Sequence, residues 1–261
     1  MTRRARAGAG MVGALAAVAL LSLAWTPWDV AALDVAHRLA APSSAHLLGT
    51  DQLGRDLLSM LMAGAAPSLG TAALALLIGM GAGVPLGLLA AERRGWADEL
   101  VARGADMLFA FPALVLALLI VAVTGPGASR AALAIGLFNI PVFVRVTRAA
   151  AVQVLARDFV AAARLAGRGG GAVARAHVLP NIAPALLVQG AVQLSLGLLA
   201  EAGLAFLGLG PQPPQASWGR MVADAQTLAG TAPGLVLWPG ACIVVSVIGF
   251  NLLADGLRAR R

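Results

Sequence analysis

Few side chains in this sequence are able to perform covalent chemistry. Lysine is absent, so all 19 basic residues are arginine, and the chain holds a single cysteine, Cys242, and three scattered histidines. Without lysine, the chain has neither the phosphate-binding residue of a P-loop nor an amine for a Schiff base. One cysteine forms no intrachain disulfide and gives no basis for a thiolate metal site. We therefore expect no catalytic residue, no metal ligands and no cofactor bound by this chain.

The acidic side chain that stands out is Glu201, which falls within a long apolar run. An ionisable residue at membrane depth is costly unless it is paired or hydrated, and such residues often belong to a substrate path. Glu201 is therefore a candidate for the translocation path. Its place near the external end of the run also allows contact with water or with a neighbouring subunit.

The composition indicates a protein that spans a lipid bilayer. Of the 261 residues, 59% are hydrophobic and 12% are charged, with a mean hydropathy of +0.85. A soluble domain has about twice that share of charged residues to cover its surface. The net charge of +7 comes from arginines that lie between apolar runs. We expect their partners to be lipid head groups and not nucleic acid.

Six apolar stretches are long enough to cross the hydrocarbon core as α-helices. We predict an all-α, polytopic membrane protein with six transmembrane helices, and we expect the first stretch to be a retained span and not a cleaved signal peptide. The expected spans are approximately Gly8–Trp25, Pro67–Ala91, Asp106–Val123, Ala131–Ala150, Ile182–Leu209 and Pro233–Leu253. They divide the chain into a tail with the first helix (1–26), an external loop (27–66), a core with five helices (67–256) and a second tail (257–261).

The arginines predict the orientation in the membrane. With both termini in the cytoplasm, 15 arginines lie on the inner side, including Arg260 and Arg261, and four lie on the outer side. This asymmetry follows the positive-inside rule. Within the external loop we expect an amphipathic helix near Val30–Leu39. At the start of the third span we expect Asp106 to pair with Arg103.

The only large cytoplasmic loop, 151–181, separates the fourth and fifth spans. Its first part is rich in alanine and should form a short helix that ends at Gly167, because glycine tolerates left-handed backbone. A second helical piece, 172–178, is expected to end before Pro180. We predict a coupling helix–turn–helix that lies along the membrane and fits a groove on a cytosolic partner.

This loop resembles the EAA motif of ABC importer permeases, whose pattern is E-A-A-x3-G-x9-I-x-L-P. Five positions match at the full spacing: Ala162, Ala163, Gly167, Leu179 and Pro180. Ala161 replaces the glutamate, and His177 replaces the isoleucine, as is common in the peptide branch of the family. The resemblance implies that the loop couples to an ATPase, with Asp158 or Arg164 supplying charge in place of the glutamate.

Two external segments are similar to the dipeptide, oligopeptide and nickel permeases. The first matches the pattern HxLGTDxxGRD from His46 onward, and the matching positions include Gly49, Thr50, Asp51, Gly54, Arg55 and Asp56. Its glycines allow tight turns and its charged residues can pair within the loop, so the segment is either a structural fold or a substrate contact. The second, from Glu201 through Pro214 to Gly219, resembles EAxLSFLGLGxxPPxPSWG of the C-type subunit.

The resemblance implies that this chain forms one half of a pore with a second, B-type permease in a bacterial inner membrane. Two cytosolic ABC ATPases would bind ATP and Mg and hydrolyse ATP, and an external binding protein would deliver peptides, nickel or other metal chelates. The alternative is a gradient-driven secondary transporter of small solutes. Such transporters often carry inverted repeats and several midplane ionisable residues, whereas this sequence has no evident repeat.

Overall fold

The computed structural model describes residues 3–213 and 215–259, so Pro214, Arg260 and Arg261 lie outside the described residues. Within these ranges every regular element is a helix, apart from one isolated bridge between Thr50 and Asp56. Five helical segments are long and apolar enough to cross a membrane: α1 (Arg3–Leu21), α2 (Leu57–Glu92), α5 (Ala128–Leu155), α8 (Leu179–Phe206, continuous with the helical residues from Gly170) and α10 (Gly234–Arg258). The predicted all-α, polytopic fold is confirmed.

The sixth candidate span is a bent pair of helices, α3 (Trp96–Phe109) and α4 (Ala113–Thr124), whose directions differ by 84°. The expectation of one uninterrupted helix over Asp106–Val123 was therefore wrong. Pro112 stands at the N-cap of α4, where it lacks an N–H and disfavours helical backbone at the residue before it. We attribute the bend between α3 and α4 to Pro112.

Ion pairs fasten α3 to α5. Asp106 pairs with Arg145 of α5, and Asp98 accepts two hydrogen bonds from Arg148 of the same helix. Arg103 pairs instead with Glu99, one turn earlier in α3. The expected local pair between Arg103 and Asp106 was therefore wrong, because Arg145 approaches Asp106 from the neighbouring helix.

The segment predicted to be external also departs from expectation. The amphipathic helix expected near Val30–Leu39 is reduced to one 3-10 turn, η1 (Val35–His37), because the backbone there bonds to the segment around Asp51. Helix α2 begins at Leu57, ten residues before the expected span. The Asp56 side chain caps it by accepting a hydrogen bond from the Ser59 N–H.

The loop predicted to be cytoplasmic forms α6 (Asp158–Leu165), a turn, α7 (Gly170–Val173) and a π-helical turn, η2 (Ala174–Val178). Pro180 does not end the second piece as expected, because the helix continues through it into α8. The Leu179 N–H bonds to the Ala174 carbonyl, five residues back. This wider turn shifts the hydrogen-bond register just where proline lacks a donor.

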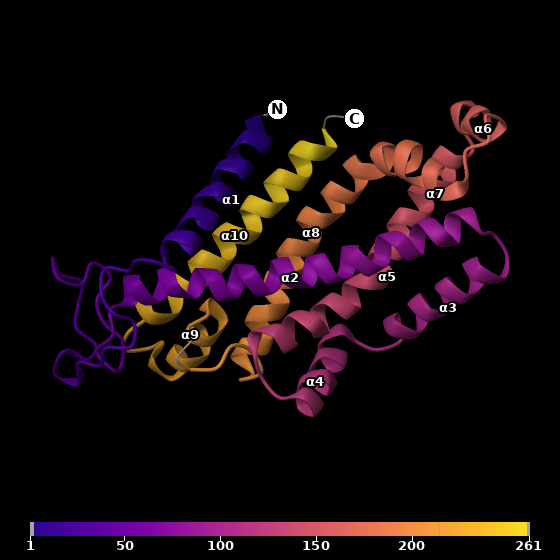
Figure 1. Ribbon diagram of the computed structural model, residues 1–261. Helices are drawn as coiled ribbons and strands as arrows, with labels where there is room; N and C mark the ends of the chain where they lie inside the picture. The colour runs from indigo at the N-terminus through magenta and orange to yellow at the C-terminus, as the bar shows by residue number, and fades with distance from the viewer. Residues whose placement is uncertain (1–2, 214, 260–261) are drawn as a thin grey trace.

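Helix α2 crosses the whole bundle and packs chiefly on α5, while α8 packs on both (Figure 1). The contact depends on glycine. A Cβ added at Gly79 would lie 2.4 Å from the Asn139 Cβ, and one at Gly83 would lie 2.6 Å from the Phe143 Cβ. Small residues thus let the two helix backbones approach closely, as is common between membrane helices.

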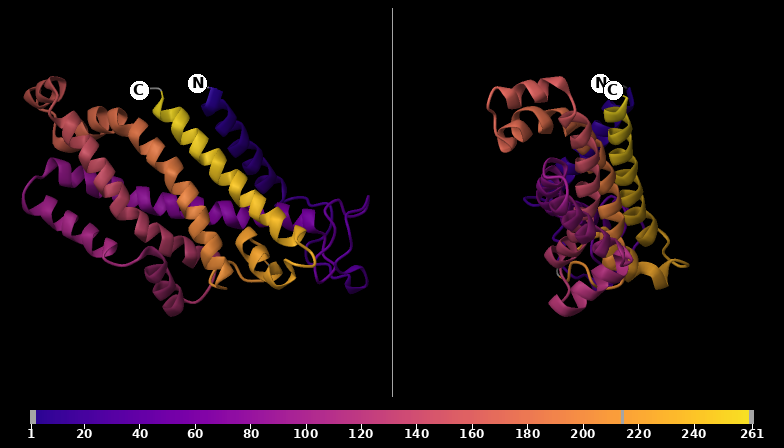
Figure 2. Two further views of the ribbon diagram at one scale, coloured as in Figure 1. Left: turned by 180° about the vertical axis from the view of Figure 1, so that it is seen from behind. Right: turned by 90° about the vertical axis from the view of Figure 1, so that its right-hand side faces the viewer.

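The two ends of the bundle differ in content (Figures 1 and 2). Both termini and the α6–α7 segment lie at one end. The long segment 22–56, α9 (Trp218–Ala225) and η3 (Gln226–Leu228) lie at the other. Helices α1 and α10 run side by side between these ends and pack on each other.

We predict that Gly83→Ala destabilises the protein in detergent by about 1–3 kcal/mol, because the added methyl group overpacks the contact with Phe143. Gly81→Ala is the matched control on the same helix, since a Cβ at Gly81 meets nothing within 4 Å. Thermal unfolding of the two purified variants measures the difference. Equal midpoints for both variants would contradict the role of the close α2–α5 contact.

Candidate functional site

The α6–α7 segment is anchored to the bundle by buried valines. Val160 of α6, Val173 of α7 and Val178 of η2 are each at most 1% exposed. They join an apolar cluster that includes Phe143 of α5 and Ile182 of α8. The segment therefore moves with the ends of α5 and α8 and is not a free loop.

The predicted coupling residues lie on this anchored segment, mostly on its outer surface. Six of them are exposed: Asp158, Ala161, Ala162, Arg164, Gly167 and Pro180. The other three are half-buried: Ala163, His177 and Leu179. Beside them, Leu165 is 91% exposed and Phe159 is 45% exposed. Large apolar side chains that face solvent next to such a motif indicate a surface that a partner covers.

The turn after α6 fixes the shape of this surface. Gly167 has φ of +82°, and the Arg168 N–H bonds to the Ala163 carbonyl five residues back. This is the glycine-terminated helix end that the spacing predicted. Phe159 lies over the ring of His177, with centroids 6.1 Å apart, which connects α6 to the π-helical turn.

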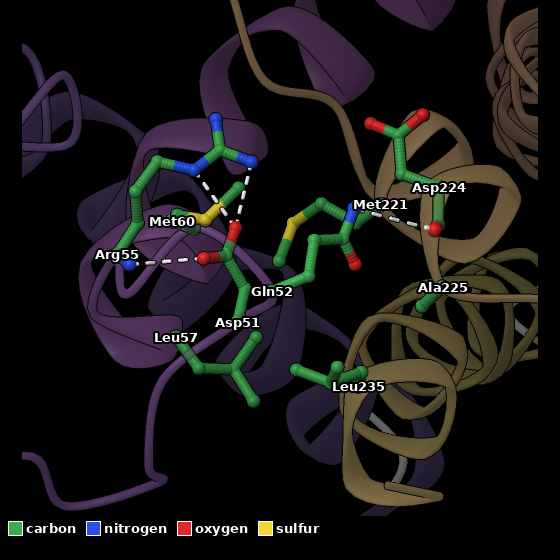
Figure 3. Close-up of a pocket in the computed structure, with 9 residues that line it drawn as sticks. All are labelled: Asp51, Gln52, Arg55, Leu57, Met60, Met221, Asp224, Ala225 and Leu235. Carbon is green, nitrogen blue, oxygen red and sulfur yellow. Dashed lines mark hydrogen bonds and ion pairs between the residues drawn. The ribbon is translucent and has the colours of Figure 1, made fainter. Parts of the chain in front are cut away.

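At the opposite end, the predicted external motif folds on itself. The Asp51 carboxylate accepts hydrogen bonds from the N–H groups of Leu53 and Arg55 and pairs with the Arg55 guanidinium at 2.7 Å. Figure 3 shows this pair at a pocket shared with α9, where the Gln52 side chain reaches the Asp224 carbonyl. The Asp51–Arg55 pair thus shapes the loop, and Gln52 connects it to α9.

Asp56 also forms its contacts close by in the chain. It bonds to Ser59 at the start of α2 and to the His46 ring at 3.0 Å, and its side chain is 2% exposed. At the surface of the same segment, a hydrogen bond with His37 lowers the pKa of Asp34 below its ordinary value.

Three further motif residues shape the backbone. Gly49 and Gly54 have φ of +82° and +77°, and a Cβ at either would meet a backbone carbonyl, that of Ala40 or Asp34. The Thr50 hydroxyl accepts from the Ala40 N–H and donates to the His37 carbonyl. All these contacts are within the chain, and they make the motif a folded structural unit in this conformation.

Glu201 is fully buried in α8. The hydroxyls nearest to its carboxylate are those of Ser68 on α2 and Ser217 at the start of α9, but neither carboxylate oxygen has a well-formed hydrogen bond. Next to it, Trp218 donates from its backbone to Ser68 and from its indole to the Leu61 carbonyl. Glu201 therefore lies at the junction of α2, α8 and α9, away from any open surface in this conformation.

A chain of carboxamides lies halfway along the long helices. Gln189 donates to Gln193 at 3.3 Å within α8, Gln193 donates to Asn139 of α5 at 2.7 Å, and Asn139 reaches the Ala75 carbonyl of α2 at 3.4 Å. Asn139 and Gln193 are each 4% exposed. Both line a cavity of about 370 Å³ between α4, α5 and α8.

Comparison with known proteins agrees with the coupling motif. Residues 83–260 match the family described as the binding-protein-dependent transport system inner membrane component. The chain is 38% identical to the nickel transport system permease protein NikC of Escherichia coli, over 95% of this chain and 90% of that protein. The chain belongs to this family.

Two further relatives have names that refer to the transport of other solutes. Over 81% of this chain and 70% of the relative, it is 45% identical to the di/tripeptide transport system permease protein DppC of Pseudomonas aeruginosa. Over 83% of this chain and 72% of the relative, it is 38% identical to the glutathione transport system permease protein GsiD of Pectobacterium atrosepticum.

The fold has counterparts among solved structures. A structure of the MetNI methionine ABC transporter in an inward facing conformation superimposes with a TM-score of 0.63 at 17% identity, over 77% of this chain and 96% of that chain. A structure of an amino acid ABC transporter with histidines gives a TM-score of 0.58 at 20% identity, over 77% of this chain. The helix arrangement is therefore that of an ABC transporter membrane subunit.

The sequence patterns did not identify two features of this permease. The exposed Leu165 sits inside the coupling motif but is not one of its defining positions. Asn139 and Gln193 are uncharged and fall in apolar runs, so only their polarity at membrane depth was available as a signal. Their pairing joins residues 54 apart in sequence, which no local pattern contains.

We predict that Asp56→Ala lowers the stability of the external end by about 1 kcal/mol, because α2 loses its N-cap and His46 loses its partner. Limited proteolysis of segment 22–56 in detergent measures the effect. Asp34→Ala is the control, since this carboxylate is exposed and pairs only with the exposed His37. Equal cleavage rates in both variants would contradict the capping role of Asp56.

Proposed function

We propose that this chain is one of two permease subunits of an ATP-driven importer for peptides, nickel or other metal chelates. The observation that carries the proposal is the similarity to peptide and nickel permeases over most of this chain and most of each relative. The family membership favours this function over a gradient-driven secondary transporter.

The partners follow from the two ends of the bundle. The outer surface of α6, with Leu165 and Phe159, is the docking surface for one of two cytosolic ABC ATPases, where ATP and Mg bind. The end that carries segment 22–56 and α9 faces the external binding protein. A second, B-type permease completes the pore. This chain performs no covalent chemistry and binds no cofactor.

The orientation follows from charge. The arginine-rich end, with both termini and α6, lies in the cytoplasm of a bacterial cell, and the protein passes through the inner membrane several times. In that orientation, closure of the ATPases pushes on α6. The push reaches α8 directly, because α7 and the π-helical turn continue into it, and the helices then rock as a rigid body.

In the same cycle Glu201 lies where α8 meets the start of α9. A carboxylate buried without a well-formed hydrogen bond is expensive to keep charged. We therefore assign Glu201 to the translocation path in the outward-facing state, in which the contact between α8 and α9 opens and water reaches the carboxylate. In the present state it is covered.

Purification of the tagged chain from native membranes in mild detergent tests the assembly. We expect a second permease and P-loop ATPases to co-purify, and we expect the eluate to hydrolyse ATP. An untagged strain processed in parallel is the control for adventitious binding. Recovery of the chain alone and inactive, across several detergents, would count against the importer.

A substitution in the coupling turn tests the α6 surface. Gly167→Val forces a β-branched residue into left-handed backbone at a cost of about 1–2 kcal/mol, so the shape of the turn must change. We expect assembly to persist, ATP hydrolysis to continue and transport to fall. Gly169→Val is the matched control, because Gly169 has extended backbone and free space around its Cβ position. Normal transport by Gly167→Val would contradict this role of the turn.

A further inference from the structure

The carboxamides of Asn139 and Gln193 are the polar part of an otherwise apolar cavity. None of the twelve described residues that line this cavity carries a charge or an imidazole, and the remaining ones are aliphatic side chains, one phenylalanine and glycine. At about 370 Å³ the cavity has the size of a small-molecule site. It lies between three helices, α4, α5 and α8, two of which are continuous spans.

The two amides retain capacity for further hydrogen bonds. A carboxamide carries two N–H donors and an oxygen with two lone pairs. In the described structure the Gln193 nitrogen donates once, to Asn139, and its oxygen accepts once, from Gln189. The Asn139 nitrogen donates once, to the Ala75 carbonyl. One donor and one acceptor site therefore remain on each amide that lines the cavity.

The pattern of one donor beside one acceptor matches a peptide group, which presents the same pair. It is a poor match for bare Ni²⁺, for which protein sites typically supply imidazole nitrogen. Within the described residues, no group of three or more His, Cys, Asp or Glu side chains is placed to hold a metal ion. The chemistry of the cavity thus favours an uncharged, amide-bearing surface of the solute.

The exposed neighbours of the cavity show where it opens. Leu196 and Leu199 of α8 are 54% and 48% exposed beside it, so the cavity opens at the side of this chain. Polar groups that face lipid are strongly disfavoured, whereas polar groups that face a water-filled passage are tolerated. The amides in this cavity are therefore accounted for if, in a two-permease pore, the opening faces the passage between the two subunits.

We propose that Asn139 and Gln193 form a contact point for the cargo midway along the passage, and that this point takes solutes with amide or peptide groups and not bare metal ions. The inference rests on the proposed importer function. Gln193 is held in position by Gln189 and Asn139, so the donors and acceptors are oriented before the cargo arrives, and less ordering is needed when it binds.

The test uses the whole complex in proteoliposomes with its binding protein. Uptake of a mixture of di- and tripeptides is followed by mass spectrometry, and uptake of radioactive Ni²⁺ without chelator is followed in parallel. We expect Gln193→Leu and Asn139→Leu to lower peptide uptake about tenfold through loss of the amide contacts, while assembly and stimulated ATP hydrolysis persist. Thr147→Val, which removes another buried polar atom of α5 away from this cavity, should leave uptake unchanged.

The possible outcomes distinguish the contact-point proposal from the importer proposal. Normal peptide uptake by both leucine variants would overturn the contact point. Uptake of Ni²⁺ but not peptides by the wild type would overturn the inferred cargo class and leave the importer function in place. Uptake of neither solute, with no stimulated ATP hydrolysis, would count against the importer itself. If Gln193→Leu fails to assemble, Gln193→Met decides, and failure of that variant to assemble would show a structural role and overturn the contact point.

Discussion

Helix α2 meets α5 with glycine against side-chain Cβ atoms, and the other helices take their positions from that crossing. Helix α8 packs on both members of the pair, α3 and α4 pack on α5, and α1 and α10 pack on the outer side of α2 and α8. In a bilayer no hydrophobic effect drives helices together, so close van der Waals contact must hold them. A methyl group at Gly79 or Gly83 would widen the crossing and with it the contacts that α8 makes with α2 and α5.

The extent to which the sequence predicted the fold depends on how local each feature is. Apolar runs are local, so the spans of α1, α5, α8 and α10 were predictable to within a few residues. The bend at Pro112 was missed, because a window of 20 residues averages over a single proline. The sequence predicted a helix end at Pro180, but the structure accommodates this proline through a π-helical turn. That turn depends on the hydrogen-bond register of the following helix, which the local sequence does not show. The segment 22–56 is held by bonds such as Trp28 to Ser59, between residues 31 apart.

How far each site could be predicted also depends on how close its residues lie in the sequence. The coupling residues share one short segment, so their spacing predicted the turn at Gly167 and the helix before it. Glu201 was recognisable as an acid in an apolar run, but its burial against Ser217 requires the chain to return through α9. Asn139 and Gln193 lie on separate helices, and hydropathy gives little weight to an amide. Their importance becomes visible only when α5 and α8 are placed together.

The helical residues from Gly170 to Phe206 form one run of 37 residues. At 1.5 Å per residue this run is about 55 Å long, more than the thickness of a bilayer with its head groups. Its first turns belong to the proposed docking segment, its middle carries Gln193, and its last turns carry Glu201. Pro180 and Pro184 each lack a backbone donor and a π-helical turn precedes them, so the ladder of hydrogen bonds is weakest near the start of this run. A displacement of the proposed docking segment would therefore reach Gln193 and Glu201 along one continuous helical run, whose most deformable part lies next to that segment.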